Sequence, residues 1–211
     1  PKTIEALDKE FDLKLNEFSS IEAQIASIAD DIAYNNHDLD DGLRAGFFSY
    51  DDLAELPMIG EIIKKFPKNY NSYDMQRINN EITRKSTSIM ITDVINTISE
   101  KVKKSKVRCN EDVRLNNEKI ADFSDKTKEE VKYIRSFLSM KMYNHDKVKA
   151  MTSNAHQIIS SLFKLFIEQD EKFIKEHMKK IISDKDKPRA VCDFIAGMTD
   201  NYAQNFYNKF N

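Results

Sequence analysis

Apolar residues recur along this chain at the spacing of an α-helix, not in the strict alternation of a half-buried strand. The first clear case is a stripe of isoleucines at Ile21, Ile25, Ile28 and Ile32. Ser19-Ser20-Ile21-Glu22 has the pattern of a capping box in front of this stripe, and Gly42 follows it as a typical helix stop. We therefore predict a helix that begins at this capping box and runs to about Asp41.

The same periodicity predicts further helices downstream. They cover roughly 50–64, 72–104, a stretch from 127 to a break or end at His145-Asp146 that carries both Arg135 and Tyr143, 150–182, and a last segment that begins near Pro188. Pro57 is an irregularity inside the first of these, and Thr127-Lys128-Glu129-Glu130 looks like another capping box. Residues 105–125 are polar and poorly periodic, so we expect a loop or a mobile insert there.

Composition supports an all-α, multi-helix fold with no convincing strand. Only four Gly and four Pro occur in 211 residues, which argues against a fold rich in strands and tight turns. Hydrophobic residues make up 40% of the chain, enough for a sizeable core. We expect a single all-helical region over 1–211, divided by the segment 105–125.

Charge and cysteine content exclude several classes of function. A net charge of −2 gives no global basic field for nucleic acid or membrane, and no apolar run is long enough to span a membrane. Cys109 and Cys192 form no metal-binding or redox motif, so a reduced, cytoplasmic setting is expected. The basic run Lys101–Arg108 is either a solvated helix end or a weak contact for an allosteric nucleotide or single-stranded nucleic acid.

Aspartates crowd the second half of the predicted first helix, at Asp30, Asp31, Asp38, Asp40 and Asp41. Carboxylates are unfavourable near the carbonyl end of a helix, and Asp is a mediocre residue in a helix interior. The cluster is therefore either a solvated face and cap or a site where something cationic offsets the local cost.

Spacing selects three residues from this stretch. Asp30, Tyr34 and Asp38 are each four positions apart, so they project from one side of the helix over about 12 Å. Asp30 could give an oxygen ligand to a divalent cation, Tyr34 an aromatic face for a sugar, and Asp38 two acceptors for a sugar hydroxyl. One carboxylate cannot hold a catalytic metal unaided, so other ligands must come from elsewhere.

Three segments carry a family resemblance: Ile28–Gly46, the pair Phe137-Leu138 with Met142-Tyr143-Asn144-His145, and Arg189–Ala203. They resemble the deoxyguanosinetriphosphate triphosphohydrolase-like family of HD-domain phosphohydrolases. The resemblance implies an HD-domain-like helical fold that hydrolyses a deoxynucleoside triphosphate (dNTP) to a deoxynucleoside and tripolyphosphate with a divalent metal ion such as Mg or Mn.

The resemblance also implies a role for each residue of the series. Asp30 corresponds to a metal ligand, Tyr34 to the residue that packs on the deoxyribose, and Asp38 to the one that binds the 3′-hydroxyl. Asp31 is adjacent to Asp30, and the register to Tyr34 favours Asp30. Arg135 and Tyr143 match positions that contact the triphosphate and its surroundings. Without the resemblance, either side chain could equally be a surface or packing residue.

The chain departs from the family pattern at its metal site. In the family a His and a His-Asp pair precede the aspartate series, yet no histidine precedes Asp30 here. We expect an incomplete metal site and an inactive isolated chain, either the C-terminal portion of a longer protein or a catalytically dead module that oligomerises or senses nucleotides. The start at Pro1, without Met, favours the former. Residues 1–100 would then complete the HD-type core and 126–211 form the C-terminal helices, and a homo-oligomer is expected.

Overall fold

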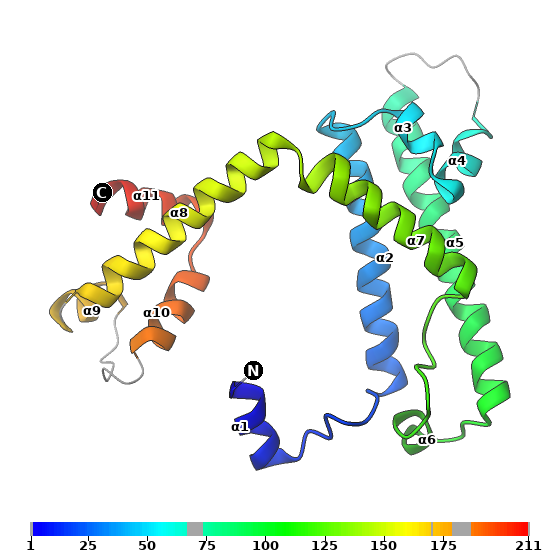
Figure 1. Cartoon of the computed structure of the whole chain (residues 1–211), viewed down its shortest axis with the longest axis horizontal. Helices are drawn as coiled ribbons and strands as arrows, with labels where there is room; N and C mark the ends of the chain where they lie inside the picture. The colour runs from blue at the N-terminus through cyan, green and yellow to red at the C-terminus, as the bar shows by residue number, and fades with distance from the viewer. Residues whose placement is uncertain (1, 67–73, 170, 179–186, 211) are drawn as a thin grey trace. The chain divides into compact units, whose positions relative to one another are not determined.

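A computed structural model describes residues 2–66, 74–169, 171–178 and 187–210 of the chain, and these contain helices and no strand (Figure 1). The all-α prediction is thus confirmed. The helices are α1 Lys2–Phe11, α2 Ile21–Arg44, α3 Tyr50–Ala54, α4 Pro57–Ile63, α5 Asp74–Ser105, α6 Asn110–Arg114, α7 Asp125–Leu138, the π-helical turn Ser139–Tyr143, α8 Asp146–Glu168, α9 Glu171–Met178, α10 Lys187–Ala196 and α11 Asp200–Phe210.

The chain divides into two compact units, Pro1–Tyr143 and Asn144–Asn211. The assignment of residues 1–100 to an HD-type core and of 126–211 to C-terminal helices stays a prediction. Each unit has its own cluster of buried apolar side chains, which explains why the division falls between them. None of the helices in the described part of the chain has the length and apolar character needed to cross a membrane.

Helix α2 starts one residue after the expected position and ends later. Its N-cap is Ser20 and not Ser19. The Ser20 hydroxyl accepts a 3.4 Å hydrogen bond from the Ala23 amide. The predicted stop at Gly42 is wrong, because Gly42 is buried inside the helix beneath the Phe48 ring. The chain reverses at Gly46, whose φ of +70° is a left-handed conformation that only glycine adopts readily.

We expect Gly42→Ala to destabilise the first unit. A Cβ at this position would overlap Cε1 and Cζ of Phe48, a ring that is itself packed edge-on against Phe137 at 4.9 Å. Such overpacking costs about 1–3 kcal/mol, against a gain of at most about 1 kcal/mol in helix propensity. Thermal unfolding would measure the change. Gly197→Ala is the control, because its nearest contact would be an ordinary 3.5 Å; equal melting of the two variants would contradict the expectation.

Two other helix starts differ from the sequence prediction for identifiable reasons. The segment 50–64 forms two helices, because Pro57 cannot continue a helix but suits the first position of α4. Helix α7 begins before the predicted capping box, with Ser124 as its cap. Thr127 then lies in the first turn as a buried residue, and its amide donates to the Ser124 hydroxyl at 3.3 Å.

The remaining boundaries show helices that periodicity missed or merged. Helix α1 was not predicted. The predicted helix 150–182 is instead α8 and α9, and its end at 179–182 lies outside the described residues, as does the predicted start of α5 at 72–73. The last segment forms two helices, α10 and α11, separated by the turn at 197–199.

The core of the first unit forms where α2 packs against α5 and α7. Its buried side chains include Ile32, Leu39, Met90 and Ile134. One polar group crosses this core: the Ser86 hydroxyl donates to Oδ1 of Asn36, and Nδ2 of Asn36 donates to the Ile32 carbonyl at 2.8 Å. Because a buried amide is costly unless it is paired, this contact favours one register between α2 and α5.

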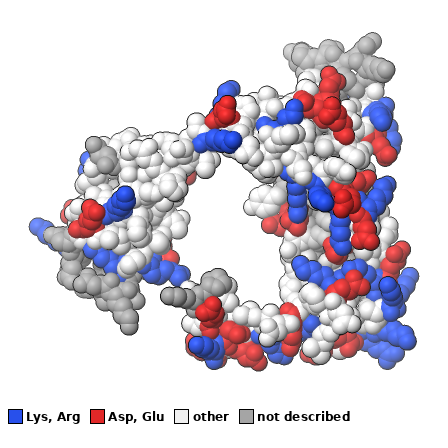
Figure 2. Space-filling model, in the orientation of Figure 1, with Lys and Arg blue, Asp and Glu red and all other residues white. Residues whose placement is uncertain are grey.

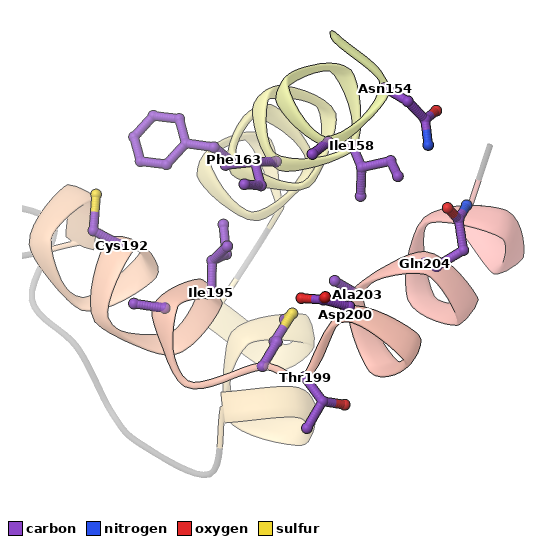
Figure 3. A pocket seen from close by; sticks show the side chains of 13 residues that line it. Asn154, Ile158, Phe163, Cys192, Ile195, Thr199, Asp200, Ala203 and Gln204 are labelled. Carbon is purple, nitrogen blue, oxygen red and sulfur yellow. The ribbon is translucent and has the colours of Figure 1, made fainter. Parts of the chain in front are cut away.

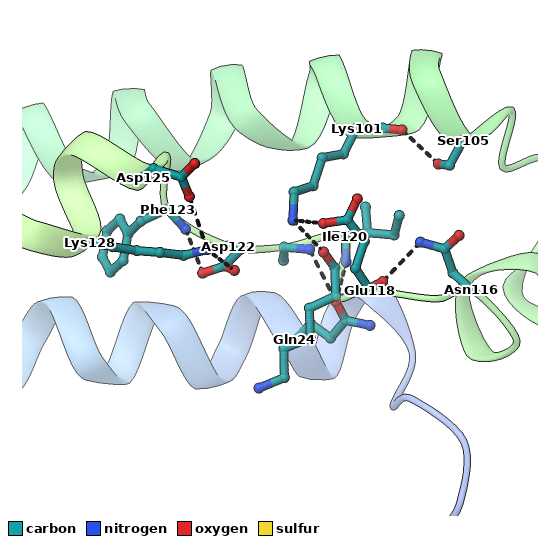
Figure 4. A network of polar contacts seen from close by, with 12 residues as sticks. Gln24, Lys101, Ser105, Asn116, Glu118, Ile120, Asp122, Phe123, Asp125 and Lys128 are labelled. Carbon is teal, nitrogen blue, oxygen red and sulfur yellow. Dashed lines mark hydrogen bonds and ion pairs between the residues drawn. The ribbon is translucent and has the colours of Figure 1, made fainter.

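The segment 105–125 is more firmly attached than the expected loop or mobile insert. Oε1 of Gln24 on α2 accepts hydrogen bonds from the amides of Ile120 and Ala121 at 2.9 and 3.1 Å, and Nε2 of Gln24 donates to the Ser19 carbonyl at 2.8 Å (Figure 4). Ile120 is fully buried. One glutamine thus ties this segment to the start of α2, which no local periodicity could reveal.

The second unit is organised around Phe166 on α8. Helices α10 and α11 pack against α8, and Phe166 is fully buried. Its ring lies 5.1 Å from Phe194 and 5.3 Å from Phe206, in arrangements typical of packed aromatic side chains. Val191 and Leu162 complete the centre of this small core.

Candidate functional site

Asp30 and Tyr34 lie on the face of α2 that points away from the core. Ile28, Ile32 and Leu39 occupy the buried face, so residues at 30 and 34 are left in solvent. The Tyr34 ring is 64% exposed, an unusual state for an aromatic side chain with no packing role. No hydrogen bond or ion pair joins the Asp30 carboxylate to another side chain in the described part of the chain. Both groups are accessible to a ligand.

Arg135 of α7 reaches α2 at Asp31. Its Nη2 lies 3.0 Å from Oδ1 of Asp31, and both side chains are about half exposed (51% and 54%). The pair sets Asp31 apart from Asp30, since one carboxylate is engaged by a cation and its neighbour is not. The assignment of Asp30 as the metal ligand stays a prediction.

Tyr143 reaches α2 two turns later. Its hydroxyl donates a hydrogen bond to Oδ2 of Asp38, which is half-buried. Partial desolvation of its hydroxyl raises the pKa of Tyr143 to about 12, with further contributions from the hydrogen bond to Asp38 and from its charge, while Arg135 acts in the opposite direction. Tyr143 is therefore a neutral donor at physiological pH and holds one oxygen of Asp38.

A π-helical turn makes these two contacts compatible. Arg135 and Tyr143 are eight positions apart, and eight residues of regular α-helix would leave them about 80° out of phase. Helix α7 ends at Leu138, and the wider turn Ser139–Tyr143 absorbs the additional residue. Both side chains then face α2. The sequence predicted one regular helix through Arg135 and Tyr143, whereas the structure changes to a π-helical turn at Ser139.

Asp31 and Asn35 are the neighbours that sequence reasoning did not assign. Asp31, Asn35 and Asp38 follow the spacing i, i+4, i+7 and so lie along one stripe of α2. Asp31 meets Arg135 of α7, and Asp38 meets Tyr143 of the π-helical turn. Asn35 is only 6% exposed, and its Nδ2 has no hydrogen-bond partner among the described residues. The spacing was readable from the sequence, but the partners on α7 were needed to recognise it.

The described residues do not form a complete metal site by themselves. The free, exposed carboxylate of Asp30 fits an oxygen-preferring divalent cation. Within residues 2–66, 74–169, 171–178 and 187–210, however, no group of three or more His, Cys, Asp or Glu side chains could hold a metal ion. A single carboxylate cannot fix a catalytic cation, so a metal site at Asp30 would need other ligands.

Two other surface features are formed by other residues. A pocket of about 560 Å³ in the second unit is lined mainly by apolar side chains of α8, α10 and α11, with Asn154, Asp200 and Gln204 among its polar groups (Figure 3). None of the predicted site residues lines it.

On the face of the first unit shown in Figure 2, acidic and basic side chains are interspersed, and Lys101 of the basic run pairs with Glu118 at 2.9 Å. Both cysteines are free and exposed.

Comparison with known proteins finds two kinds of sequence similarity. Residues 121–209 match a phosphohydrolase-associated domain. Deoxyguanosinetriphosphate triphosphohydrolase-like proteins are similar over nearly the whole chain: one from Caulobacter sp. (strain K31) is 36% identical over 99% of this chain and 53% of its own length. Those from Rhizobium meliloti and Neorickettsia sennetsu are 34% and 35% identical, over 94% and 98% of this chain and 50% and 54% of theirs.

The chain spans about half the length of the curated relatives it matches. The matches cover all three segments that carried the sequence resemblance, including the helix with Asp30, Tyr34 and Asp38. The chain belongs to the deoxyguanosinetriphosphate triphosphohydrolase-like family of HD-domain phosphohydrolases.

Proposed function

We propose that this chain forms part of a metal-dependent triphosphohydrolase, which converts a dNTP and water to a deoxynucleoside and tripolyphosphate. The observation that carries the proposal is the convergence on α2: Arg135 and Tyr143 arrive from one adjoining segment beside the accessible series of Asp30, Tyr34 and Asp38. Helix α2 then presents a carboxylate for a cation, an aromatic ring for a sugar and an acceptor for a hydroxyl. The guanidinium of Arg135 lies beside them for phosphate. Family membership supports the same reaction class.

Each residue has a role that follows from its chemistry. Asp30 would contribute one ligand to a divalent cation such as Mg or Mn, which when bound polarises phosphate and activates water. Tyr34 offers its exposed face to the deoxyribose. Asp38 keeps Oδ1 available for the 3′-hydroxyl, because Tyr143 engages only Oδ2.

Arg135 would bind phosphate by exchanging partners. Its guanidinium is held by a single carboxylate in an exposed ion pair, and such pairs are weak in water. A triphosphate carries more charge and can accept a bidentate contact from the planar guanidinium. The contact with Asp31 therefore keeps Arg135 near the site at little cost to phosphate binding. The homo-oligomer, the cytoplasmic setting and any allosteric nucleotide or nucleic-acid contact stay predictions.

The products of hydrolysis test this proposal directly. A protein of the relatives' full length that includes this chain would be incubated with each dNTP and Mg²⁺ or Mn²⁺. Phosphorus NMR should then show tripolyphosphate appearing in step with deoxynucleoside. Release of pyrophosphate, of orthophosphate or of no product would contradict the proposed reaction.

Asp38→Ala should reduce kcat/KM for a dNTP by about 10- to 100-fold, the value of a hydrogen bond to a charged group. The same substitution should change kcat/KM for a 2′,3′-dideoxynucleoside triphosphate (ddNTP) much less, because that substrate has no 3′-hydroxyl to lose. Steady-state kinetics with the two substrates gives the comparison. Equal losses for both would show that Asp38 does not bind this hydroxyl.

A further inference from the structure

The π-helical turn that carries Tyr143 contributes no buried side chain to the core. None of its residues, Ser139–Tyr143, is buried. The i→i+5 pattern is rare and usually confined to single turns, and side-chain contacts can help to fix the position of this one. Met142 packs partly against the core of the first unit, and Lys141 provides the second anchor.

Lys141 is held by Asp52, a residue of α3. Its Nζ lies 2.8 Å from Oδ1 of Asp52, with side chains 39% and 30% exposed. The carboxylate of Asp52 is already oriented, because Oδ2 accepts hydrogen bonds from both the amide and the hydroxyl of Ser49 at 2.8 Å. Lys141, followed by the Ser49 contacts, holds the pKa of Asp52 well below its usual range. The acid is therefore charged and fixed in direction.

The base of this anchor is also rigid. Ser49 and Asp52 form a complete capping box at the start of α3, and Leu53 in the same helix is fully buried. Phe48, immediately before the cap, packs on Phe137 of α7. The N-terminus of α3 is thus fixed to the same helix that leads into the π-helical turn.

We propose that Lys141 and Asp52 are positioning residues: their ion pair holds the π-helical turn so that the Tyr143 hydroxyl orients the carboxylate of Asp38. Neither residue needs to touch the nucleotide. What Asp38 then binds rests on the proposed function, whereas the positioning itself is a property of this chain. For the reaction, the consequence is that this ion pair increases the preference for substrates that carry a 3′-hydroxyl.

The positioning can be measured in this chain by NMR. Labelled tyrosine, assigned with Tyr143→Phe, should give a nuclear Overhauser effect (NOE) between the Tyr143 ring and the β protons of Asp38. The effect should be lost in Lys141→Met and in Asp52→Asn. It should persist in Lys141→Arg, which keeps the charge, and in the control Lys132→Met, an exposed lysine on α7. An undiminished effect in Lys141→Met, with unfolding unchanged, would overturn the proposal.

Kinetics in a protein of the relatives' full length tests the consequence. Lys141→Met should reduce the preference for a dNTP over the matching ddNTP by about five- to tenfold, the value of one misplaced hydrogen bond. Turnover of the ddNTP should be unchanged, and Lys141→Arg should restore the preference. Equal losses on both substrates would mean a merely structural role and would overturn the inference. Absence of any hydrolysis by the wild type would instead contradict the proposed function, and the NMR result would still decide the positioning.

Discussion

Asp30→Ala is expected to abolish hydrolysis and tight binding of the divalent cation in a protein of the relatives' full length that includes this chain. The carboxylate is exposed and unpaired among the described residues, so its removal should leave the fold unchanged while deleting a ligand. A catalytic metal contributes several kcal/mol to transition-state stabilisation, which corresponds to a rate loss of more than about 10³-fold. Turnover at saturating dNTP and metal content by atomic emission would measure the two effects together.

Two other aspartates of α2 are the matched controls. Asp41→Ala removes an exposed acid from the same helix and should leave metal content and turnover nearly unchanged. Asp31→Ala should keep the metal while it releases Arg135, so its effect should fall mainly on KM for the nucleotide. Full activity in Asp30→Ala, or loss of the metal in Asp31→Ala alone, would show that the ligand was assigned to the wrong residue.

Phe166→Ala is expected to destabilise the second unit by about 3–5 kcal/mol, the usual cost of removing a buried phenylalanine. The side chain is fully buried, and its ring contacts Phe173 at 5.6 Å as well as Phe194 and Phe206. Because the unit spans only Asn144–Asn211, a loss of this size approaches the whole stability of such a small domain. The unit should unfold well below the temperature at which the wild type does.

Amide hydrogen exchange resolves this effect by region. In Phe166→Ala, the amides of α8, α10 and α11 should lose protection, while those of α2 and α5 should keep it. Met151→Ala is the control, since its side chain lies on the same helix but is 72% exposed and should change stability by less than about 0.5 kcal/mol. Protection that is equal in both variants would mean that Phe166 does not organise the unit.

Periodicity predicted the all-α class and the common face of Asp30, Tyr34 and Asp38, because both depend on local spacing within one helix. It failed where the deciding contact is distant in sequence. Gly42 is of a residue type that often ends a helix, yet packing against Phe48 makes it an interior residue. Likewise the polar stretch before α7 was expected to be loose, although Gln24 binds its backbone.

The candidate site was predictable to the same degree. Its half on α2 follows from spacing, and the resemblance supplied Arg135 and Tyr143. The π-helical turn was not foreseeable, because a single additional residue in a turn leaves no compositional mark. The ion pair between Lys141 and Asp52 was equally hidden, since it joins residues 89 positions apart whose charges are ordinary in isolation.

The link from Gln24 to the Ile120 amide also bears on how the chain reaches its native state. It joins residues 96 positions apart, so it forms only after a long stretch of chain has been closed into a loop. Closing such a loop costs entropy that grows with the logarithm of its length, and non-local contacts of this kind slow folding. The second unit is assembled from helices near one another in sequence and should therefore form first. During refolding, protection of α8, α10 and α11 should precede that of Ile120.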